Sequence, residues 1–174
     1  MRIISGSRKG HTIHAPLGRS TRPTSDRVRE NLFNIVGPVD GASVLDLYAG
    51  SGALGLEALS RGAASADFVE TRPSSLHALK ANIVLLRARD KTRVYKKDAL
   101  PFAAELRDGS YDIAFVDPPY GSRMLDRVIE GWQRSHFSPI LVAEHEATHA
   151  LPAGAELMRF GETSVSIYGM GTAR

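Results

Sequence analysis

The 174-residue sequence has no cysteine. This absence excludes disulfide bonds and thiolate metal sites, so nothing in the composition indicates an oxidising compartment. Long hydrophobic runs are also absent, because no apolar stretch approaches the roughly 18 residues of a membrane-spanning helix. The first residues, Met1-Arg-Ile-Ile, are followed by serine, glycine and charged residues rather than by the apolar core of a signal peptide. We therefore expect a cytoplasmic protein without a membrane segment.

The basic residues are unevenly distributed along the chain. Positions 1–30 hold seven Arg and Lys residues and two acidic residues, whereas the remainder holds 15 basic and 17 acidic residues. A basic arm on a nearly neutral body suits a polyanion such as nucleic acid, although a solvated flank would also be charged. The candidate RNA contacts are Arg2, Arg8, Lys9, Arg19, Arg22, Thr24, Arg27 and Arg29.

After this arm, segments with strand-like and helix-like patterns alternate, without repeats or low-complexity linkers. Strands are expected at 44–47, 66–70, 93–97, 111–117 and 140–144, and helices at 53–61, 73–88, 102–107 and 124–134. Residues 156–160 and 164–168 flank Gly161-Glu-Thr163 and predict an antiparallel hairpin. The alternation predicts an α/β fold in which helices cover both faces of a mainly parallel sheet.

The arm itself contains signals for a small hairpin followed by a helix. Gly6 and Gly10 would turn the chain so that Arg8 and Lys9 lie at the tip of the hairpin, although a plain loop would have a similar composition. Pro23-Thr-Ser-Asp26 supplies capping residues for a helix. The apolar face of that helix would consist of Val28, Leu32, Ile35 and Val36.

A glycine-rich loop follows the first strand of the α/β region. Gly50 and Gly52 allow a tight turn close to a ligand, and the next helix begins with unpaired N–H groups. The pattern Gly50-x-Gly-x-x-Gly55 also fits a dinucleotide-binding oxidoreductase. Asp46 argues against a pyrophosphate and favours a ligand with ammonium and sulfonium charges, such as S-adenosylmethionine. Alternatively, Asp46 would cap the N–H groups of the loop.

Acidic residues follow successive strands, which predicts one nucleoside pocket at the carboxyl edge of the sheet. Glu70 would accept hydrogen bonds from ribose hydroxyls, and Asp98 would accept one from the adenine amino group. The predicted S-adenosylmethionine contacts are Asp46, Tyr48, Ala49, Gly50, Ser51, Gly52, Glu70, Thr71, Asp98 and Ala99.

The stretch Phe115-Val-Asp-Pro-Pro-Tyr120 ends an apolar strand in a carboxylate, two prolines and an aromatic ring. The prolines hold the backbone extended and lack N–H groups, so the Asp117 carboxylate and the Pro118 carbonyl remain as acceptors. Tyr120 offers a face on which a base can stack. This arrangement suits the exocyclic amine of a flipped-out base. Alternatively, the segment would be a polar turn that only follows a buried strand. The candidate catalytic residues are Asp117, Pro118, Pro119 and Tyr120.

His145-Glu-Ala-Thr-His149 matches the H-E-x-x-H motif, which binds zinc when it lies on a helix. The segment continues an apolar strand and meets Leu151-Pro152 soon afterwards, which leaves little room for a helix. We expect a strand end and a loop here, and no metal site.

Four segments, residues 1–6, 22–34, 46–62 and 115–120, resemble motifs of the bacterial small-subunit (16S) ribosomal RNA guanine N2-methyltransferase family. Residues 22–34 are the most specific of them, because the other motifs mark only an S-adenosylmethionine-dependent amino-methyltransferase. The resemblance implies a Rossmann-like class I methyltransferase fold, with a seven-stranded, mostly parallel sheet and an antiparallel C-terminal hairpin. It divides the chain into a basic RNA-binding extension, residues 1–36, and a methyltransferase domain, residues 37–174, which together form one compact unit.

The same resemblance implies the reaction. S-adenosylmethionine would methylate the 2-amino group of one guanine in the small-subunit RNA by in-line transfer, leaving S-adenosylhomocysteine and using no metal. The RNA would be presented within a partly assembled 30S particle, and the enzyme would act as a monomer. Arg72 departs from the family pattern, since an acid is usual at that position of the cofactor rim.

The residues alone permit other functions. The same amine chemistry would serve adenine or cytosine in DNA, another RNA, or a protein glutamine. A function without catalysis is also possible, in which the protein is an RNA-binding assembly factor with a vestigial cofactor pocket.

Overall fold

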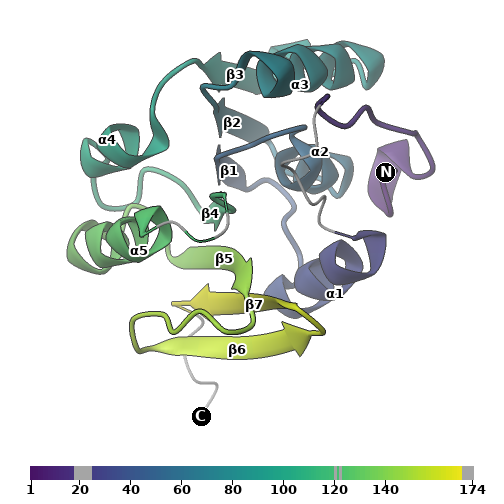
Figure 1. Ribbon diagram of the computed structural model, residues 1–174. Helices are drawn as coiled ribbons and strands as arrows, with labels where there is room; N and C mark the ends of the chain where they lie inside the picture. The colour runs from purple at the N-terminus through teal and green to yellow at the C-terminus, as the bar shows by residue number, and fades with distance from the viewer. Residues whose placement is uncertain (18–24, 120, 122, 170–174) are drawn as a thin grey trace.

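The computed structural model describes residues 1–17, 25–119, 121 and 123–169, and its centre is one seven-stranded sheet (Figure 1). The strand order is β3-β2-β1-β4-β5-β7-β6. Strands β1 to β5 are parallel, whereas β7 runs antiparallel to both β5 and β6. The strands are β1 (Ser43–Leu47), β2 (Ser65–Val69), β3 (Thr92–Tyr95), β4 (Ile113–Val116), β5 (Ile140–Glu146), β6 (Ala155–Phe160) and β7 (Thr163–Tyr168). The predicted α/β sheet with its antiparallel C-terminal hairpin is confirmed.

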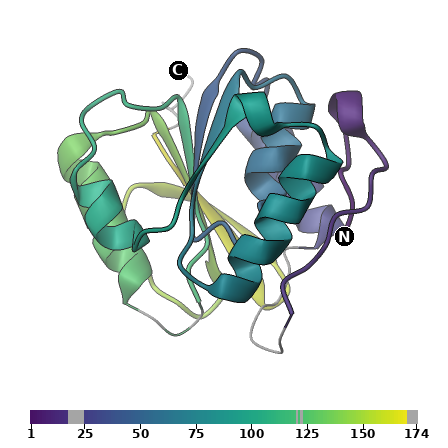
Figure 2. The ribbon, with the colours of Figure 1, turned by 90° about the horizontal axis from the view of Figure 1, so that it is seen from above.

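Helices form a layer on each face of the sheet, as Figures 1 and 2 show. On one face lie α1 (Asp26–Val36), α2 (Ala53–Ser60) and α3 (Pro73–Leu85), and on the other lie α4 (Ala99–Ala104) and α5 (Met124–Ser135). Each layer encloses its own hydrophobic cluster, with Phe68 and Phe115 in the first and Trp132 and Phe137 in the second. Among the described residues, no helix combines the length and apolarity that crossing a membrane requires.

Two helices differ by three residues from the sequence-based expectation, each for a local reason. The helix expected at 73–88 ends at Leu85, because Arg87 adopts a left-handed backbone with φ of 50°. The helix expected at 102–107 begins earlier, at Ala99, because the Asp98 side chain accepts a hydrogen bond from the Leu100 N–H at 3.0 Å and caps it.

Residues 1–14 form a hairpin-like arm outside α2 and α3. Arg2 and Thr12 make an antiparallel bridge, and Ile3 N donates to the His11 carbonyl at 2.9 Å. The predicted hairpin is thus present as a short bridge, and its tip is the 3-10 helix η1 (Gly6–Arg8). Ile3 and Ile13 are buried in the same cluster as the sheet, so the arm is part of the core.

Helix α1 closes this face of the sheet over β4. The Ser25 side chain accepts from the Val28 N–H at 3.2 Å, which is the N-terminal cap that the sequence predicts. Phe33 packs against Phe115 with ring centroids 5.6 Å apart. The chain leaves α1 towards the amino end of β1, so α1 begins near the carboxyl edge of the sheet. The start of the arm and the start of α1 therefore lie near the edge that carries the predicted site.

The register of the central strands places three acids on one face. Asp46 pairs with Phe115, so it shares a face with Asp117, two residues further along β4. Val116 pairs with Ala143, which brings Glu144 beside Asp117 on that same face. The face is the one covered by α1, α2 and α3.

Candidate active site

The glycine loop between β1 and α2 contains glycines with two different roles. A Cβ at Gly55 would lie 2.4 Å from the Phe68 ring, so this glycine is needed for close packing of α2 on the sheet. Gly50 has φ of 56°, and a Cβ there would meet nothing closer than 4.0 Å. Gly50 is therefore the position at which the backbone is open to a ligand.

Glu70 holds this loop in place. Its Oε2 accepts from the Gly50 N–H at 2.9 Å, and its Oε1 accepts from the N–H groups of Thr71 and Arg72, both at 2.8 Å. The Arg72 guanidinium also lies 3.6 Å from Oε1. The structure thus shows Glu70 as an anchor between the end of β2 and the glycine loop. Its contact with ribose stays a prediction.

Asp46 is buried beneath the same loop. Its Oδ2 accepts from the Gly55 N–H at 3.0 Å, so the capping role considered above is present. Burial raises the pKa of Asp46 to about 8, and the nearby Glu70 adds to the rise while the bond from Gly55 opposes it. A bound cation would favour the ionised form of this carboxyl.

Asp117 and Pro118 lie at the carboxyl end of β4. The Asp117 N–H donates to the Leu47 carbonyl at 3.4 Å, which holds the segment against β1 as it leaves the sheet. Burial raises the pKa of the Asp117 carboxyl well above its usual range, and the charges of Glu144 and Asp46 raise it further, whereas Arg72 lowers it. Pro118 is buried and Pro119 is exposed. Tyr120 lies outside the described residues.

Glu144 is a site residue that sequence reasoning missed. It is 4 % exposed on β5 and lies beside Asp117 in the register of the parallel strands. The signal was present in the sequence, because Glu144 directly follows the apolar run Ile140-Leu-Val-Ala143, just as Asp117 follows an apolar run. The site therefore contains three neighbouring carboxyls on β1, β4 and β5, an arrangement that attracts positive charge.

The remaining predicted cofactor residues surround the loop. Tyr48 adopts a left-handed backbone with φ of 59°, and its buried hydroxyl has no hydrogen-bond partner within the described part of the chain. Burial raises the pKa of Tyr48 to about 12, with the charge of Asp98 adding to it. Asp98 is exposed at the start of α4, where its Oδ1 already caps Leu100. The structure brings together Asp46, Tyr48, Ala49, Gly50, Ser51, Gly52, Glu70, Thr71, Asp98 and Ala99 around the carboxyl edge of β1, β2 and β3.

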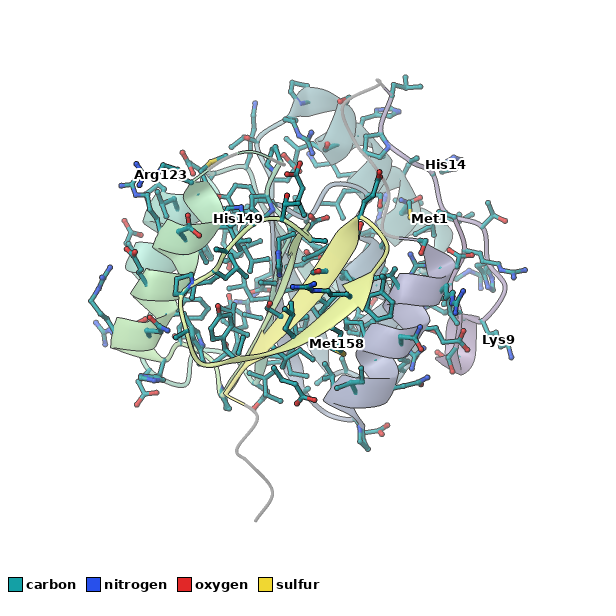
Figure 3. The ribbon with its side chains drawn as sticks, turned by 60° about the horizontal axis from the view of Figure 1, so that its bottom comes forward. Met1, Lys9, His14, Arg123, His149 and Met158 are labelled. Atoms are coloured by element: carbon teal, nitrogen blue, oxygen red, sulfur yellow. The ribbon has the colours of Figure 1, made fainter. Side chains whose placement is uncertain are left out.

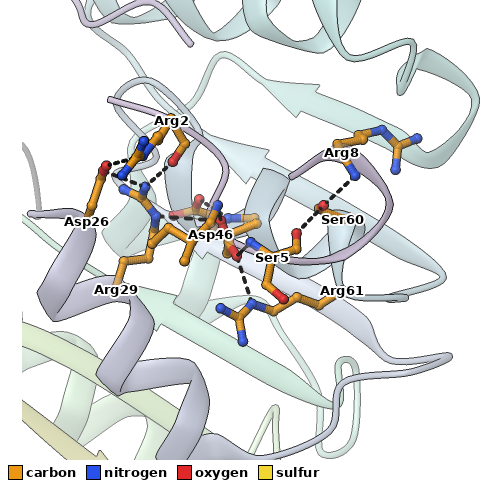
Figure 4. Close-up of polar contacts among 11 residues, drawn as sticks. Arg2, Ser5, Arg8, Asp26, Arg29, Asp46, Ser60 and Arg61 are labelled. Atoms are coloured by element: carbon orange, nitrogen blue, oxygen red, sulfur yellow. Dashed lines mark hydrogen bonds and ion pairs between the residues drawn. The ribbon is translucent and has the colours of Figure 1, made fainter. Parts of the chain in front are cut away.

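One predicted RNA contact is wrong. Arg29 is fully buried, and its Nη2 donates to the Arg2 carbonyl and to Asp26 (Figure 4). Its Nε lies 3.8 Å from the buried carboxylate of Glu57. A guanidinium held in this way cannot reach a phosphate at the surface, so Arg29 joins α1 to α2 and to the arm.

The other basic candidates are spread along the molecule. Arg2 and Arg27 are exposed near the carboxyl edge. Arg8 instead bonds to the far end of the domain, because its Nε donates to the Leu86 carbonyl at 2.8 Å and its N–H donates to Ser60 at 2.9 Å. Lys9, the next residue, lies at the same end of the domain, and Figure 3 shows it well apart from His14. Arg19, Arg22 and Thr24 lie outside the described residues.

The His145 segment forms a strand end and a turn, as predicted. His145 lies within β5, and its Nε2 is 2.9 Å from the Ser166 hydroxyl. Burial lowers the pKa of His145. His149 is 2.9 Å from Asp126 on α5. Over the described residues, no cluster of three or more His, Cys, Asp or Glu side chains has the arrangement of a metal site.

A family model described as "Conserved hypothetical protein 95" matches residues 1–169. The chain belongs to this family. It is 40% identical over 180 residues to "Putative rRNA methyltransferase YlbH" of Bacillus subtilis, covering 97% of this chain and 98% of that protein. It is 39% identical over 158 residues to "Ribosomal RNA small subunit methyltransferase D" of Escherichia coli K12, covering 87% of this chain and 78% of the relative.

Solved structures give the same result for the fold. "Putative methyltransferase yhhF" from Escherichia coli superposes with a TM-score of 0.80 at 35% identity, covering 97% of this chain and 96% of the other. An RNA methyltransferase from Salinibacter ruber in complex with S-adenosyl-L-homocysteine has a TM-score of 0.65 at 15% identity, covering 84% of this chain and 92% of that one, and shows the shared fold alone. The fold is that of class I S-adenosylmethionine-dependent methyltransferases, and the chain is a methyltransferase enzyme.

Proposed function

We propose that this enzyme transfers a methyl group from S-adenosylmethionine to the exocyclic 2-amino group of a guanine in small-subunit ribosomal RNA. The observation that carries the proposal is the position of Asp117 and Pro118, two acceptors at the end of β4 beside the glycine loop. The family relationship and the relatives named as ribosomal RNA methyltransferases support it.

The residues present fit S-adenosylmethionine. The cradle at Gly50 is open to a ligand, whereas a phosphate would meet the buried carboxyl of Asp46 and the partly buried Asp117 at the same edge. An ammonium or sulfonium group would be attracted by those carboxyls. Tyr48, Glu70 and Asp98 would hold the nucleoside part of the cofactor, which when bound supplies an electrophilic methyl group.

The protein would activate the acceptor chiefly by orienting it. An exocyclic amine is a poor nucleophile, because its lone pair is delocalised into the base. If the Asp117 carboxylate and the Pro118 carbonyl accept its two hydrogens, electron density is localised on nitrogen and the positive charge that grows there is stabilised. Holding the amine in line at near-attack distance would supply most of the acceleration. Asp117 would then take the released proton.

The distribution of basic residues supports a large, folded RNA as the substrate. Arg2 and Arg27 are near the catalytic edge, while Lys9 lies beyond the C-terminal end of α2, a helix about 12 Å long. One RNA segment that contacted both regions would have to span the domain. We therefore propose that a monomer acts in the cytoplasm on a partly assembled 30S particle, with Arg19, Arg22 and Thr24 as further RNA contacts.

Methyl transfer from labelled S-adenosylmethionine tests the proposal directly. Small subunits that lack the modification and free 16S RNA are each incubated with wild-type enzyme and with Asp117→Asn, and the digested nucleosides are identified by mass spectrometry. We expect labelled 2-methylguanosine from the wild type, with more label in the particle. Label in methyladenosine or methylcytidine would overturn the choice of base. Binding of particles without any transfer would favour the assembly-factor alternative.

A further inference from the structure

Asn82 connects the N-terminal arm to the glycine loop. It lies in α3 and is 0 % exposed. Its Oδ1 accepts from the His14 N–H at 2.7 Å, and its Nδ2 donates to the His14 carbonyl at 2.9 Å. The same Nδ2 donates to the Ser51 carbonyl at 3.0 Å. The side chain therefore pairs with the backbone of the arm as a strand would, while its second donor holds the loop.

The two partners of Asn82 belong to different parts of the proposed site. Ser51 is in the glycine loop next to Gly50, the position open to a ligand. His14 lies two residues beyond Thr12, which forms a bridge with the exposed Arg2 near the carboxyl edge. A buried amide is costly unless all its groups are paired, and here both its oxygen and its nitrogen are paired. Displacement of either partner would leave Asn82 with an unmet hydrogen bond.

We propose that Asn82 is a positioning residue that couples RNA binding by the arm to cofactor binding by the glycine loop. The proposal rests on the proposed function, because that function supplies the two ligands. When RNA fixes the backbone at His14, Asn82 fixes Ser51 and the loop binds the cofactor more tightly. By thermodynamic linkage, the cofactor must tighten RNA binding by the same factor.

The arm has a second attachment that provides a matched control. The Ser60 hydroxyl accepts from the Arg8 N–H and donates to the Ser5 carbonyl at the C-terminal end of α2 (Figure 4). Like Asn82, Ser60 is a buried polar side chain that bonds to the backbone of the arm. Its side-chain bonds do not reach the glycine loop. Ser60→Ala would therefore loosen the arm while leaving the link to Ser51 intact.

The experiment measures the affinity for S-adenosylhomocysteine, which has no methyl group to transfer, with and without saturating 16S RNA. Wild type, Asn82→Ala and Ser60→Ala are compared by calorimetry. We expect RNA to tighten binding in the wild type within the roughly 5- to 150-fold range typical of coupled sites. Asn82→Ala should reduce this ratio to near one, whereas Ser60→Ala should keep it. A ratio of one in the wild type, or an unchanged ratio in Asn82→Ala, would overturn the proposal.

A second variant keeps the test decisive if Asn82→Ala does not fold. His14→Pro removes the N–H that Asn82 Oδ1 accepts, and His14 is exposed, so the core stays intact. We expect a reduced ratio in this variant too, and a ratio equal to that of the wild type would contradict the proposal. The result is separable from the proposed function. Coupled binding without methyl transfer would refute the reaction alone, and transfer with a wild-type ratio of one would refute the coupling alone.

Discussion

Glu144 lies beside Asp117 at the carboxyl ends of two neighbouring parallel strands, with both side chains on the same buried face of the sheet. Burial and the charge of Glu144 raise the pKa of the Asp117 carboxyl. The proposed role of Asp117 as an acceptor requires the ionised form. Under that proposal, the arrival of positive charge would favour the form of Asp117 that the reaction uses.

Glu144→Gln should shift the pH dependence of the reaction. Removing the Glu144 charge lowers the pKa of Asp117, so Asp117 ionises at lower pH. We expect the rising limb of kcat/KM against pH to move to lower pH than in the wild type. Steady-state rates across a pH series on the same RNA measure this limb. A limb that stays in place would show that the two carboxyls do not interact.

Asp117→Ala should reduce turnover far more than cofactor affinity. Asp117 is assigned to the acceptor, and loss of one such polar contact typically costs about 10²- to 10³-fold in kcat. We expect the dissociation constant for S-adenosylmethionine to change only a few-fold. Single-turnover transfer and calorimetry measure the two quantities separately. Equal losses in both would remove Asp117 from its acceptor role.

In the ligand-free protein, the free energy of unfolding should fall less steeply with rising pH in Asp46→Asn than in the wild type. The pKa of Asp46 is raised from 3.8 to about 8, so between these values the folded state holds a proton that the unfolded state has lost. Stability from this group is fully present below the unfolded pKa and is lost as pH rises through the folded one, by at most about 1.4 kcal/mol per pH unit. Thermal unfolding of wild type and variant from pH 5 to pH 8 tests this. Parallel curves would show that Asp46 does not titrate in this window.

Arg27→Ala should weaken RNA binding, whereas Arg29→Ala should lower the stability of the fold. Arg27 is exposed near the catalytic edge, and its loss should lower the slope of log affinity for RNA against log salt by about 0.7 to 0.9 for one lost phosphate contact. Arg29→Ala should instead destabilise the fold by about 1 to 3 kcal/mol, because the fully buried Arg29 side chain no longer donates to the Arg2 carbonyl and to Asp26. Exposed Arg134 on α5 is the control for charge alone. An unchanged slope in Arg27→Ala would show that Arg27 makes no phosphate contact.

Gly50→Ala and Gly55→Ala should separate ligand binding from folding. The Gly55 Cβ would overlap the Phe68 ring, so this variant should lose stability. The Gly50 Cβ has space in the empty protein, and its left-handed φ costs only about 1 kcal/mol for alanine. We expect Gly50→Ala to fold and to bind S-adenosylhomocysteine weakly. Chemical denaturation and calorimetry distinguish the two effects, and full binding by Gly50→Ala would place the cofactor elsewhere.

Sequence patterns predicted most of the fold because local rules determine it. The alternation of strand-like and helix-like segments predicted the parallel sheet, and the capping residues at positions 23–26 predicted where α1 begins. The pattern could not show that Arg29 is buried, because its neighbour Glu57 lies in another helix. Asn82 was hidden for the same reason, since its partners His14 and Ser51 are distant in sequence. Acids at strand ends were predictable as a class, whereas Glu144 lies within β5 and comes beside Asp117 only through the pairing of β4 with β5.

The attachment of Arg8 to Leu86 also affects how the protein is made. These residues are 78 positions apart, and Ile3 and Ile13 are buried against helices that follow them in the chain. During synthesis the arm emerges first, but its docking surface is complete only after α3 has left the ribosome. Until then two isoleucines that belong to the core remain exposed to the solvent. The arm is thus the first segment to be translated, but it can dock only after the chain as far as Leu86, about half of the sequence, has been made.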